Sequence, residues 1–475
     1  MGGLESGQAD EYFELIRPAG VIESIYKIHH GLGVLSNTIV CATYERTDNI
    51  HLTPGILYAA LPLVVSEHPA LATIIVDQPS KKKIGGKRAW QARLRKICVK
   101  DCVRFVDNAA EQEQFIRLLQ EEHDIWFKTE DRAKPLWRVV VNVTQEQQET
   151  GQDKSISTDI DVAKHEMKPE SMALLQALGM RFSICIGLLS YLSSFMVKFF
   201  LRSSYTFFSD VMFKEGLPSK DSPVPLAKRP VTKLERMCLN PSQLAATLKA
   251  CRKHNTSITT LIETLIHVTL ASDVYPAAKV GLSYLAVDLR RFLPTEFSNT
   301  MGNYVSSHQT IHWLCNYRRA GVTSPANDRQ IALMWELSQR AKADLDSAMF
   351  RHQTPRPVAN ALGLTAIGED DESIMAGIYK ILDVAVTKTF CVSSLVESKS
   401  QSSGPWQLKS AEFSVSAQKS QVGPMLYFAM ASMRDDQCVI NVSHEEGVLQ
   451  TGVVRKILEG VESRLIMLLE AENGT

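Results

Sequence analysis

The sequence predicts a two-domain α/β protein in which each domain is a mixed sheet flanked by helices. Its 475 residues, 45% of them hydrophobic, can bury two large cores. Segments with helical and strand periodicity alternate along both halves. Between the halves, residues 214–230 contain four prolines, which continue neither a helix nor a central strand. We therefore expect similar-sized domains over 1–213 and 231–475, with 214–230 as the crossover linker.

The first half contains segments that predict both kinds of element. An apolar helix, GILYAALPLVVSEH, ends before Pro69, because the residue before a proline disfavours helical backbone. A β-branched strand, ATIIVDQP, stops at Pro79, and EQEQFIRLLQEEHD has the apolar spacing of an amphipathic helix. A further strand is expected over 135–143. It leads into 144–159, a polar stretch without periodicity that predicts a surface loop.

The second half repeats this alternation. Asn240 is the expected N-cap of one helix, and a second helix is expected over 259–271. A buried strand in KVGLSYLAVDLRRFLP is followed by a long helix over 328–349. The segments MLYFAMASM and QCVINVS predict paired strands, and 453–469 predicts a closing helix with apolar residues at helical spacing.

The charge balance gives no support to a nucleic-acid partner. Lys plus Arg and Asp plus Glu both number 52, so the formal net charge is zero. The basic stretch 80–100 is interpreted as a solvated surface, because the acidic residues of 111–124 soon offset it.

Cysteine usage and the N-terminus both favour a cytoplasmic location. The nine cysteines are scattered and form no CxxC pair, which fits a reducing compartment. Residues 1–20 have no apolar core behind a positive head, unlike a secretory signal. The apolar segment 181–202 holds 16 uncharged residues between Arg181 and Lys198, short of the ~20 that a helix needs to span a bilayer. It predicts an amphipathic helix that packs on the protein or lies on a membrane surface, such as the endoplasmic reticulum or a lipid droplet.

Segments along nearly the whole chain resemble the blocks of one enzyme family. In order they are RPAGVIESIYKIHHGLGVLSNTIVCATY, EHPALATIIV, HDIWFKTEDRAKPLWRVVV, DLRRFLP with MGNYVSSH, FCVSSL, FSVSA and VSHEEGV. In this order they are similar to the alcohol O-acetyltransferases, within the superfamily of chloramphenicol acetyltransferase, plant BAHD acyltransferases and condensation domains. The resemblance implies two domains that meet at a tunnel. It also implies a small-molecule alcohol and acetyl-CoA, or another acyl-CoA, as co-substrates, no bound cofactor, and a monomer.

The family's catalytic motif, HHxxxDG, is missing from this sequence. The resemblance places AKHEMKPES where the motif belongs, which puts His165 at the catalytic histidine and Pro169 at the aspartate. His29 and His30 form a tempting pair in the N-terminal block. We reject them as the base, because no aspartate and glycine follow them at the spacing of the motif.

Acyl transfer to an alcohol needs one imidazole to take the hydroxyl proton as the oxygen attacks the thioester carbonyl. His165 is the candidate base. The resemblance implies that the family's aspartate supports the catalytic loop by pairing with an arginine, so Glu170 is the candidate replacement and Arg290 or Arg291 its partner. Two other interpretations of His165 stay open. It is a loop histidine without a role, or a wrong splice or frame within 144–180 hides the true motif.

The remaining candidates are weaker. The resemblance implies that oxyanion and CoA contacts come from the C-terminal domain, which points to Ser393, Ser394, Ser414 and Ser416. His308 is a further candidate for the tunnel. For each of them an ordinary structural role is the stronger interpretation. No histidine or cysteine pair lies at ligand spacing, so we expect no metal site.

Two functions from different classes remain. The first is an acyl-CoA-dependent O-acyltransferase that acetylates a hydroxyl of a lipophilic alcohol or secondary metabolite. The second, suggested by the missing HHxxxDG, is a relative that binds a small molecule or catalyses a different reaction in the same tunnel, because a fold does not fix a function.

Overall fold

The computed structural model of the chain describes two large parts of the sequence and several short stretches. The described ranges are 11–46, 52–80, 86–106, 111–142, 159–162, 205–208, 228–321, 327–351, 354–364, 389–398, 404–420, 422–433 and 437–473, with single residues and pairs besides. His165, Glu170, the segment 181–202 and nearly all of the 214–230 linker lie outside them, as does the polar stretch 144–158.

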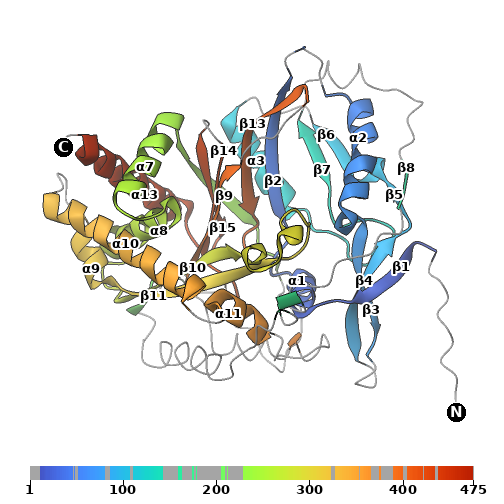
Figure 1. The fold of residues 1–475 in the computed structure, drawn as a ribbon, viewed down its shortest axis with the longest axis horizontal. Helices are drawn as coiled ribbons and strands as arrows, with labels where there is room; N and C mark the ends of the chain where they lie inside the picture. The colour runs from blue at the N-terminus through green and yellow to red at the C-terminus, as the bar shows by residue number, and fades with distance from the viewer. Residues whose placement is uncertain are drawn as a thin grey trace.

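A six-stranded mixed sheet organises the C-terminal half (Figure 1). Its strand order is β11-β10-β12-β14-β15-β9. The central pairs β10/β12 and β12/β14 are parallel, and the outer pairs are antiparallel. β14 and β15 are buried along nearly their whole length, as expected of central strands with continuous apolar sequence. The strands are β9 (Thr232–Leu239), β10 (Val280–Asp288), β11 (Val305–Trp313), β12 (Phe390–Ser398), β14 (Leu426–Met433) and β15 (Cys438–Glu445).

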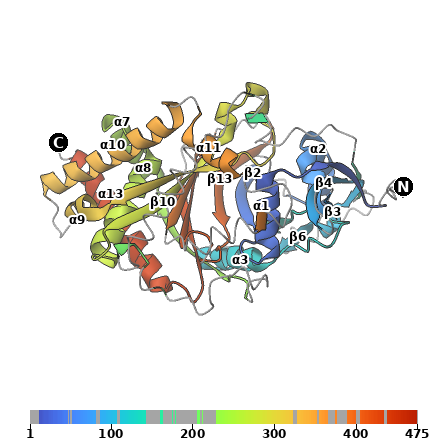
Figure 2. The ribbon, with the colours of Figure 1, turned by 90° about the horizontal axis from the view of Figure 1, so that it is seen from below.

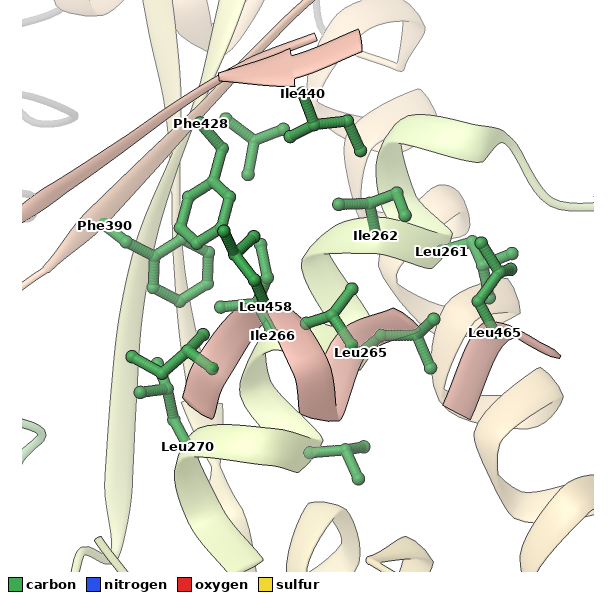
Figure 3. Packing of buried hydrophobic residues seen from close by; sticks show 14 of the residues in the cluster. Leu261, Ile262, Leu265, Ile266, Leu270, Phe390, Phe428, Ile440, Leu458 and Leu465 are labelled. Atoms are coloured by element: carbon green, nitrogen blue, oxygen red, sulfur yellow. The ribbon is translucent and has the colours of Figure 1, made fainter. Parts of the chain in front are cut away.

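Helices pack on this sheet and build the largest core. In Figure 3, Ile262 of α8 (Ile258–Thr269) lies toward Ile440 of the sheet, and Leu261 lies beside Leu465 of the closing helix. The same core takes side chains from the closing helix and from a long helix that packs on α8. The other helices of this half are α7 (Pro241–Lys253), α9 (Leu314–Ala320), α10 (Asp328–Phe350), α11 (Arg356–Leu364) and α13 (Thr451–Asn473).

The N-terminal half is divided among smaller sheets. β1 (Phe13–Pro18), β4 (Lys87–Leu94) and β3 (Thr73–Pro79) form an antiparallel sheet in that order. A helix, α2 (Pro54–Glu67), contributes Leu61 to the core of this half. Two short pairs complete it: β5 (Lys96–Cys98) with β8 (Asp159–Asp161), and β6 (Val103–Val106) with β7 (Val139–Asn142).

One strand of the C-terminal half crosses to the N-terminal half. β13 (Trp406–Val415) pairs antiparallel with β2 (Thr38–Arg46) from Trp406 opposite Arg46 to Val415 opposite Thr38. Figures 1 and 2 show β13 and β2 side by side between the halves, with α1 (Val21–Gly31) next to them. Backbone hydrogen bonds therefore join the halves in addition to the expected linker.

Most elements predicted from the sequence are confirmed. Asn240 caps α7: its side chain accepts from the Gln243 N–H, and the Gln243 side chain accepts in return from the Asn240 N–H. The segment 135–143 is shorter as a strand than predicted, because β7 begins at Val139. The helix expected over 259–271 begins one residue earlier and widens into a π-helical turn, Leu270–Val274.

Two expectations about the environment can be compared with the described residues. The eight described cysteines are all free thiols. Within the described ranges, none of the helices combines the length and the apolar character needed to cross a membrane.

Candidate active site at the junction of the two halves

A buried histidine ties the two halves together. His123 lies at the end of α3 (Gln112–Asp124), with Nδ1 2.6 Å from the Asn37 side-chain oxygen and Nε2 2.7 Å from the Ser414 hydroxyl. Because an amide oxygen only accepts, Nδ1 donates to Asn37, and the Ser414 hydroxyl donates to Nε2. Burial, with a smaller contribution from Arg138, lowers the pKa of His123 to about 3. The imidazole is therefore neutral and fully hydrogen-bonded.

The neighbours of His123 reinforce this connection. The Asp124 carboxylate accepts a 2.9 Å hydrogen bond from the Thr232 N–H at the start of β9. The buried Glu122 carboxylate pairs with Arg138 at 2.6 Å and also with Arg104. His123 and Asp124, the first two residues of the HDIWFKTEDRAKPLWRVVV block, thus hold α3 to the C-terminal half, while the Glu122 ion pairs lie within the N-terminal half.

Two of the predicted serines lie at the same junction. Ser414 and Ser416 are both 1% exposed. Ser416 Oγ accepts from the backbone N–H groups of Ser36 at 3.1 Å and Asn37 at 3.4 Å, and Ser414 Oγ bonds to His123. In this geometry both hydroxyls hold β13 to the N-terminal half.

The other two predicted serines lie on β12, one of the central strands of the six-stranded sheet. Ser393 and Ser394 lie on β12 and are half-buried. Ser393 hydrogen-bonds with the Tyr427 hydroxyl of β14, which also bonds to Cys391. Burial, with a smaller contribution from the nearby Cys391, raises the pKa of Tyr26 on α1. Tyr26 of α1, Cys391 and Ser393 of β12 and Tyr427 of β14 thus form a polar patch between α1 and the six-stranded sheet, which we call the α1 face.

The histidine pair of the N-terminal block lies on α1. The two ring nitrogens of His30 lie 3.2 Å from the Ser36 carbonyl and 2.9 Å from the Phe127 carbonyl, so the ring is held by backbone groups. Burial lowers the pKa of His29 to about 4. A general base works best with a pKa near the operating pH, so the lowered pKa of His29 does not suit a general base.

Arg290 and Arg291 follow β10 and differ in their surroundings. Arg290 hydrogen-bonds to Asp288 at 3.2 Å and to the Thr300 carbonyl, and its guanidinium lies 4.7 Å from the centre of the Tyr304 ring. Arg291 is exposed. Their predicted partner, Glu170, lies outside the described residues together with His165, so the pairing stays a prediction.

His308 points away from the junction. It lies on β11, is 2% exposed, and its Nε2 is 3.0 Å from the Asp344 carboxylate on α10. This contact joins β11 to α10 within the C-terminal half, and a role of His308 in the tunnel stays a prediction.

The structure also brings together a cluster that the sequence analysis missed. Glu263, His267 and His312 each offer one ligand atom, and these atoms lie within 4.8 Å of one another. Glu263 and His267 are one helical turn apart on α8, a spacing that places both on one face. That spacing was the one signal in the sequence that could have indicated this cluster. The third member comes from β11, which only the tertiary structure places beside α8.

Comparisons with known proteins agree with this architecture. No family model matches the sequence. The trichothecene 15-O-acetyltransferase TRI3 of Fusarium sporotrichioides matches with a TM-score of 0.61 and 14% identity, over 98% of this chain and 97% of that chain. The condensation domain of the monacolin K polyketide synthase MokA matches with a TM-score of 0.52 and 13% identity, over 97% and 98%. A probable alcohol acetyltransferase, FCK4 of Fusarium pseudograminearum (strain CS3096), is 25% identical over 240 residues.

This chain has the two-domain fold that these acetyltransferase and condensation-domain structures share. The two-domain α/β fold predicted from the sequence is thereby confirmed. The match to FCK4 covers 49% of this chain and 45% of that relative, so it spans less than half of the relative's length. The matched structures with this fold include an acetyltransferase and a condensation domain, so the reaction has to be argued from the site.

Proposed function

We propose that the protein is an acyl-CoA-dependent O-acyltransferase that acetylates a hydroxyl of a lipophilic alcohol or secondary metabolite. The observation that carries the proposal is the match to the TRI3 acetyltransferase over 98% of this chain and 97% of that chain. The FCK4 match, to a probable alcohol acetyltransferase, supports the same reaction from the sequence side.

In the proposed reaction the acceptor hydroxyl attacks the thioester carbonyl of acetyl-CoA. His165 takes the hydroxyl proton, the oxygen–carbon bond forms, and the carbon–sulfur bond breaks to release CoA, which recovers the proton. Glu170 supports the loop that carries His165 and pairs with Arg290. Arg290 already lies on a fixed turn, because its Asp288 and Thr300 contacts hold the side chain.

The α1 face is the proposed wall of the acceptor channel. Tyr26 leaves 42% of its surface exposed on α1. Leu395, which follows Ser394 on the central strand β12, is 57% exposed. An aromatic ring and an aliphatic side chain beside a few polar groups suit a lipophilic alcohol.

A second function is favoured by one observation, the missing HHxxxDG motif. On this alternative the protein binds a small molecule at the junction, or catalyses another reaction there, without acyl transfer. The superfamily's range of reactions is compatible with it.

Turnover distinguishes the two functions. Purified protein is incubated with acetyl-CoA and a panel of lipophilic alcohols, and free thiol is measured. Loss of one positioned base costs roughly 10²–10⁴-fold in rate, so we expect His165→Ala to reduce kcat by that factor while the melting temperature is unchanged. Glu170→Ala should cost less than His165→Ala and more than the adjacent control Glu166→Ala.

Two results would decide against this proposal. If wild-type protein releases no thiol with any alcohol but binds one of them, the second function is favoured. If His165→Ala turns over like wild type, His165 is not the base.

A further inference from the structure

The strongest unassigned feature lies in the core of the C-terminal half. Glu263 is 1% exposed and His267 is 0% exposed, and the side chain of His312 is 14% exposed. Each has one polar atom without a hydrogen-bond partner among the described residues: Glu263 Oε2, His267 Nε2 and His312 Nε2. A buried polar atom without a partner costs about 1–3 kcal/mol, so a cluster of them requires an explanation.

The other polar atoms of the same side chains are all hydrogen-bonded. His267 Nδ1 donates to the Glu263 backbone carbonyl at 2.9 Å. The His267 proton is therefore on Nδ1, and Nε2 presents its lone pair to the cluster. Glu263 Oε1 accepts from the hydroxyls of Ser283 at 2.6 Å and Thr310 at 2.9 Å.

The third side chain is held in the same way. His312 Nδ1 lies 2.8 Å from the Tyr317 hydroxyl, which leaves Nε2 turned toward the cluster. In metal sites a ligating histidine typically bonds through its other ring nitrogen to a second group that fixes its orientation, and ligating carboxylates are likewise hydrogen-bonded. All three side chains here have such outer partners before any ion is placed.

We propose that Glu263, His267 and His312 form a binding site for a divalent transition-metal ion, with Zn²⁺ as the best-suited ion. Two imidazole nitrogens and one carboxylate oxygen are a donor set that zinc proteins use. The ligand atoms lie within 4.8 Å of one another. Small side-chain rotations can therefore bring all three to the ~2.0–2.2 Å bond lengths of zinc, with a water as fourth ligand.

An ion pair between His312 and Glu263 explains fewer of the unpaired atoms than a bound metal ion does. His312 Nε2 is 3.6 Å from Glu263 Oε1, which is too long for a hydrogen bond, and that oxygen already accepts from two hydroxyls. Such a pair leaves Glu263 Oε2 and His267 Nε2 without partners. One cation between the three side chains engages every unpaired atom at once.

The proposed ion would lie between a helix and a strand of the C-terminal half. It joins α8, through Glu263 and His267, to β11, through His312, and so fixes the helix on the sheet edge. Gly281 on β10 leaves room for the His267 ring, since a Cβ there would lie 2.7 Å from His267 Cδ2. None of these residues belongs to the proposed acyl-transfer machinery, so the site is independent of that function.

The test measures metal content and metal binding rather than turnover. Wild-type protein without a histidine tag is purified in the presence of Zn²⁺, desalted, and analysed by plasma mass spectrometry. We expect about one zinc per chain, as a site with three protein ligands predicts. Chelator-treated protein should take up Co²⁺ with visible absorption bands of a coordinated ion, and its melting temperature should rise again when Zn²⁺ is added.

Variants assign the ion to these side chains. His312→Gln, the change at the least buried ligand, should weaken zinc binding by more than the roughly 10–100-fold expected of an outer-partner variant such as Tyr317→Phe. The control is His254→Gln, which removes a partly exposed histidine paired with Glu472. It should bind zinc like wild type.

Iron in place of zinc at the same residues would support the site, because two histidines and one carboxylate also bind Fe²⁺. The proposal is overturned if wild-type protein retains and rebinds no Zn²⁺, Co²⁺ or Fe²⁺. It is equally overturned if His312→Gln and Tyr317→Phe both bind zinc as tightly as the His254→Gln control.

Discussion

His123 at the junction and His267 in the C-terminal core are both 0% exposed, and in both cases burial lowers the pKa to about 3. They differ in their hydrogen bonds. Both nitrogens of His123 have partners, whereas Nε2 of His267 has none among the described residues. His123, with both ring nitrogens hydrogen-bonded, cross-links the two halves. His267, with one free ring nitrogen beside two other unpaired ligand atoms, is a group that can bind an ion. Burial and pKa alone would not separate these roles.

The largest effect on stability is expected for His123→Ala. The change leaves a cavity between the halves and removes both hydrogen bonds, so Asn37 and Ser414 lose buried partners. We expect a loss of roughly 3 kcal/mol in the free energy of unfolding, measured by urea denaturation. The loss should be the same with and without chelator. A chelator-dependent loss would mean that the junction and the metal cluster are coupled.

Gly281→Ala should affect the other histidine. The added methyl group would lie 2.7 Å from His267 Cδ2 and 2.8 Å from Phe207 Cε2, so the core must shift. We expect a loss of about 2 kcal/mol and weaker zinc uptake. Gly452→Ala is the matched control, because a Cβ at that position on α13 meets nothing within 4 Å. Zinc uptake equal to that of the control would contradict the placement of His267.

The pH dependence of stability tests whether His123 stays neutral. Its folded pKa of about 3 lies below the ~6.5 of an unfolded chain, so the unfolded state binds more protons between these values. The contribution of this group is complete above pH ~6.5 and falls as the pH drops below it, by ~1.4 kcal/mol per pH unit. Urea denaturation at pH 7.5 and 5.5 should therefore show a smaller decrease for His123→Gln than for wild type. Equal decreases would show that His123 is not the titrating group.

The smallest effect is expected for Asp344→Asn. Its hydrogen bond to the buried His308 is the principal reason that the pKa of Asp344 is lowered, but the carboxylate is half-exposed. Solvent screens such a pair, so the loss should stay below about 1 kcal/mol in a denaturation experiment at pH 6. A loss of unfolding free energy as large as that of His123→Ala would show that the His308–Asp344 contact is a major stabilising link between β11 and α10.

Local signals in the sequence predicted much of the fold. In the closing helix α13, apolar residues at helical spacing predicted its buried face, and Val454, Ile457, Val461 and Leu465 are all buried. Asn240 predicted the start of α7 through its capping geometry. Both signals depend on residues within one or two helical turns, which is the range over which periodicity and capping act.

The candidate site could be predicted only in part. The resemblance directed attention to Ser414 and Ser416, and the structure places both at the junction. Their partners, His123 and Asn37, could not be predicted, because nothing in the local pattern indicates that β13 leaves its own half to pair with β2.

The sequence by itself therefore determined the alternation of elements and the family resemblance, since these depend on propensity and on short-range order. Only the tertiary structure decided which buried polar groups meet. Glu263 and His267 share a helix face, but His312 joins them because β11 pairs with β10 beneath α8. Such convergence depends on packing between segments far apart in the chain, where each polar atom must find a partner or bind an ion.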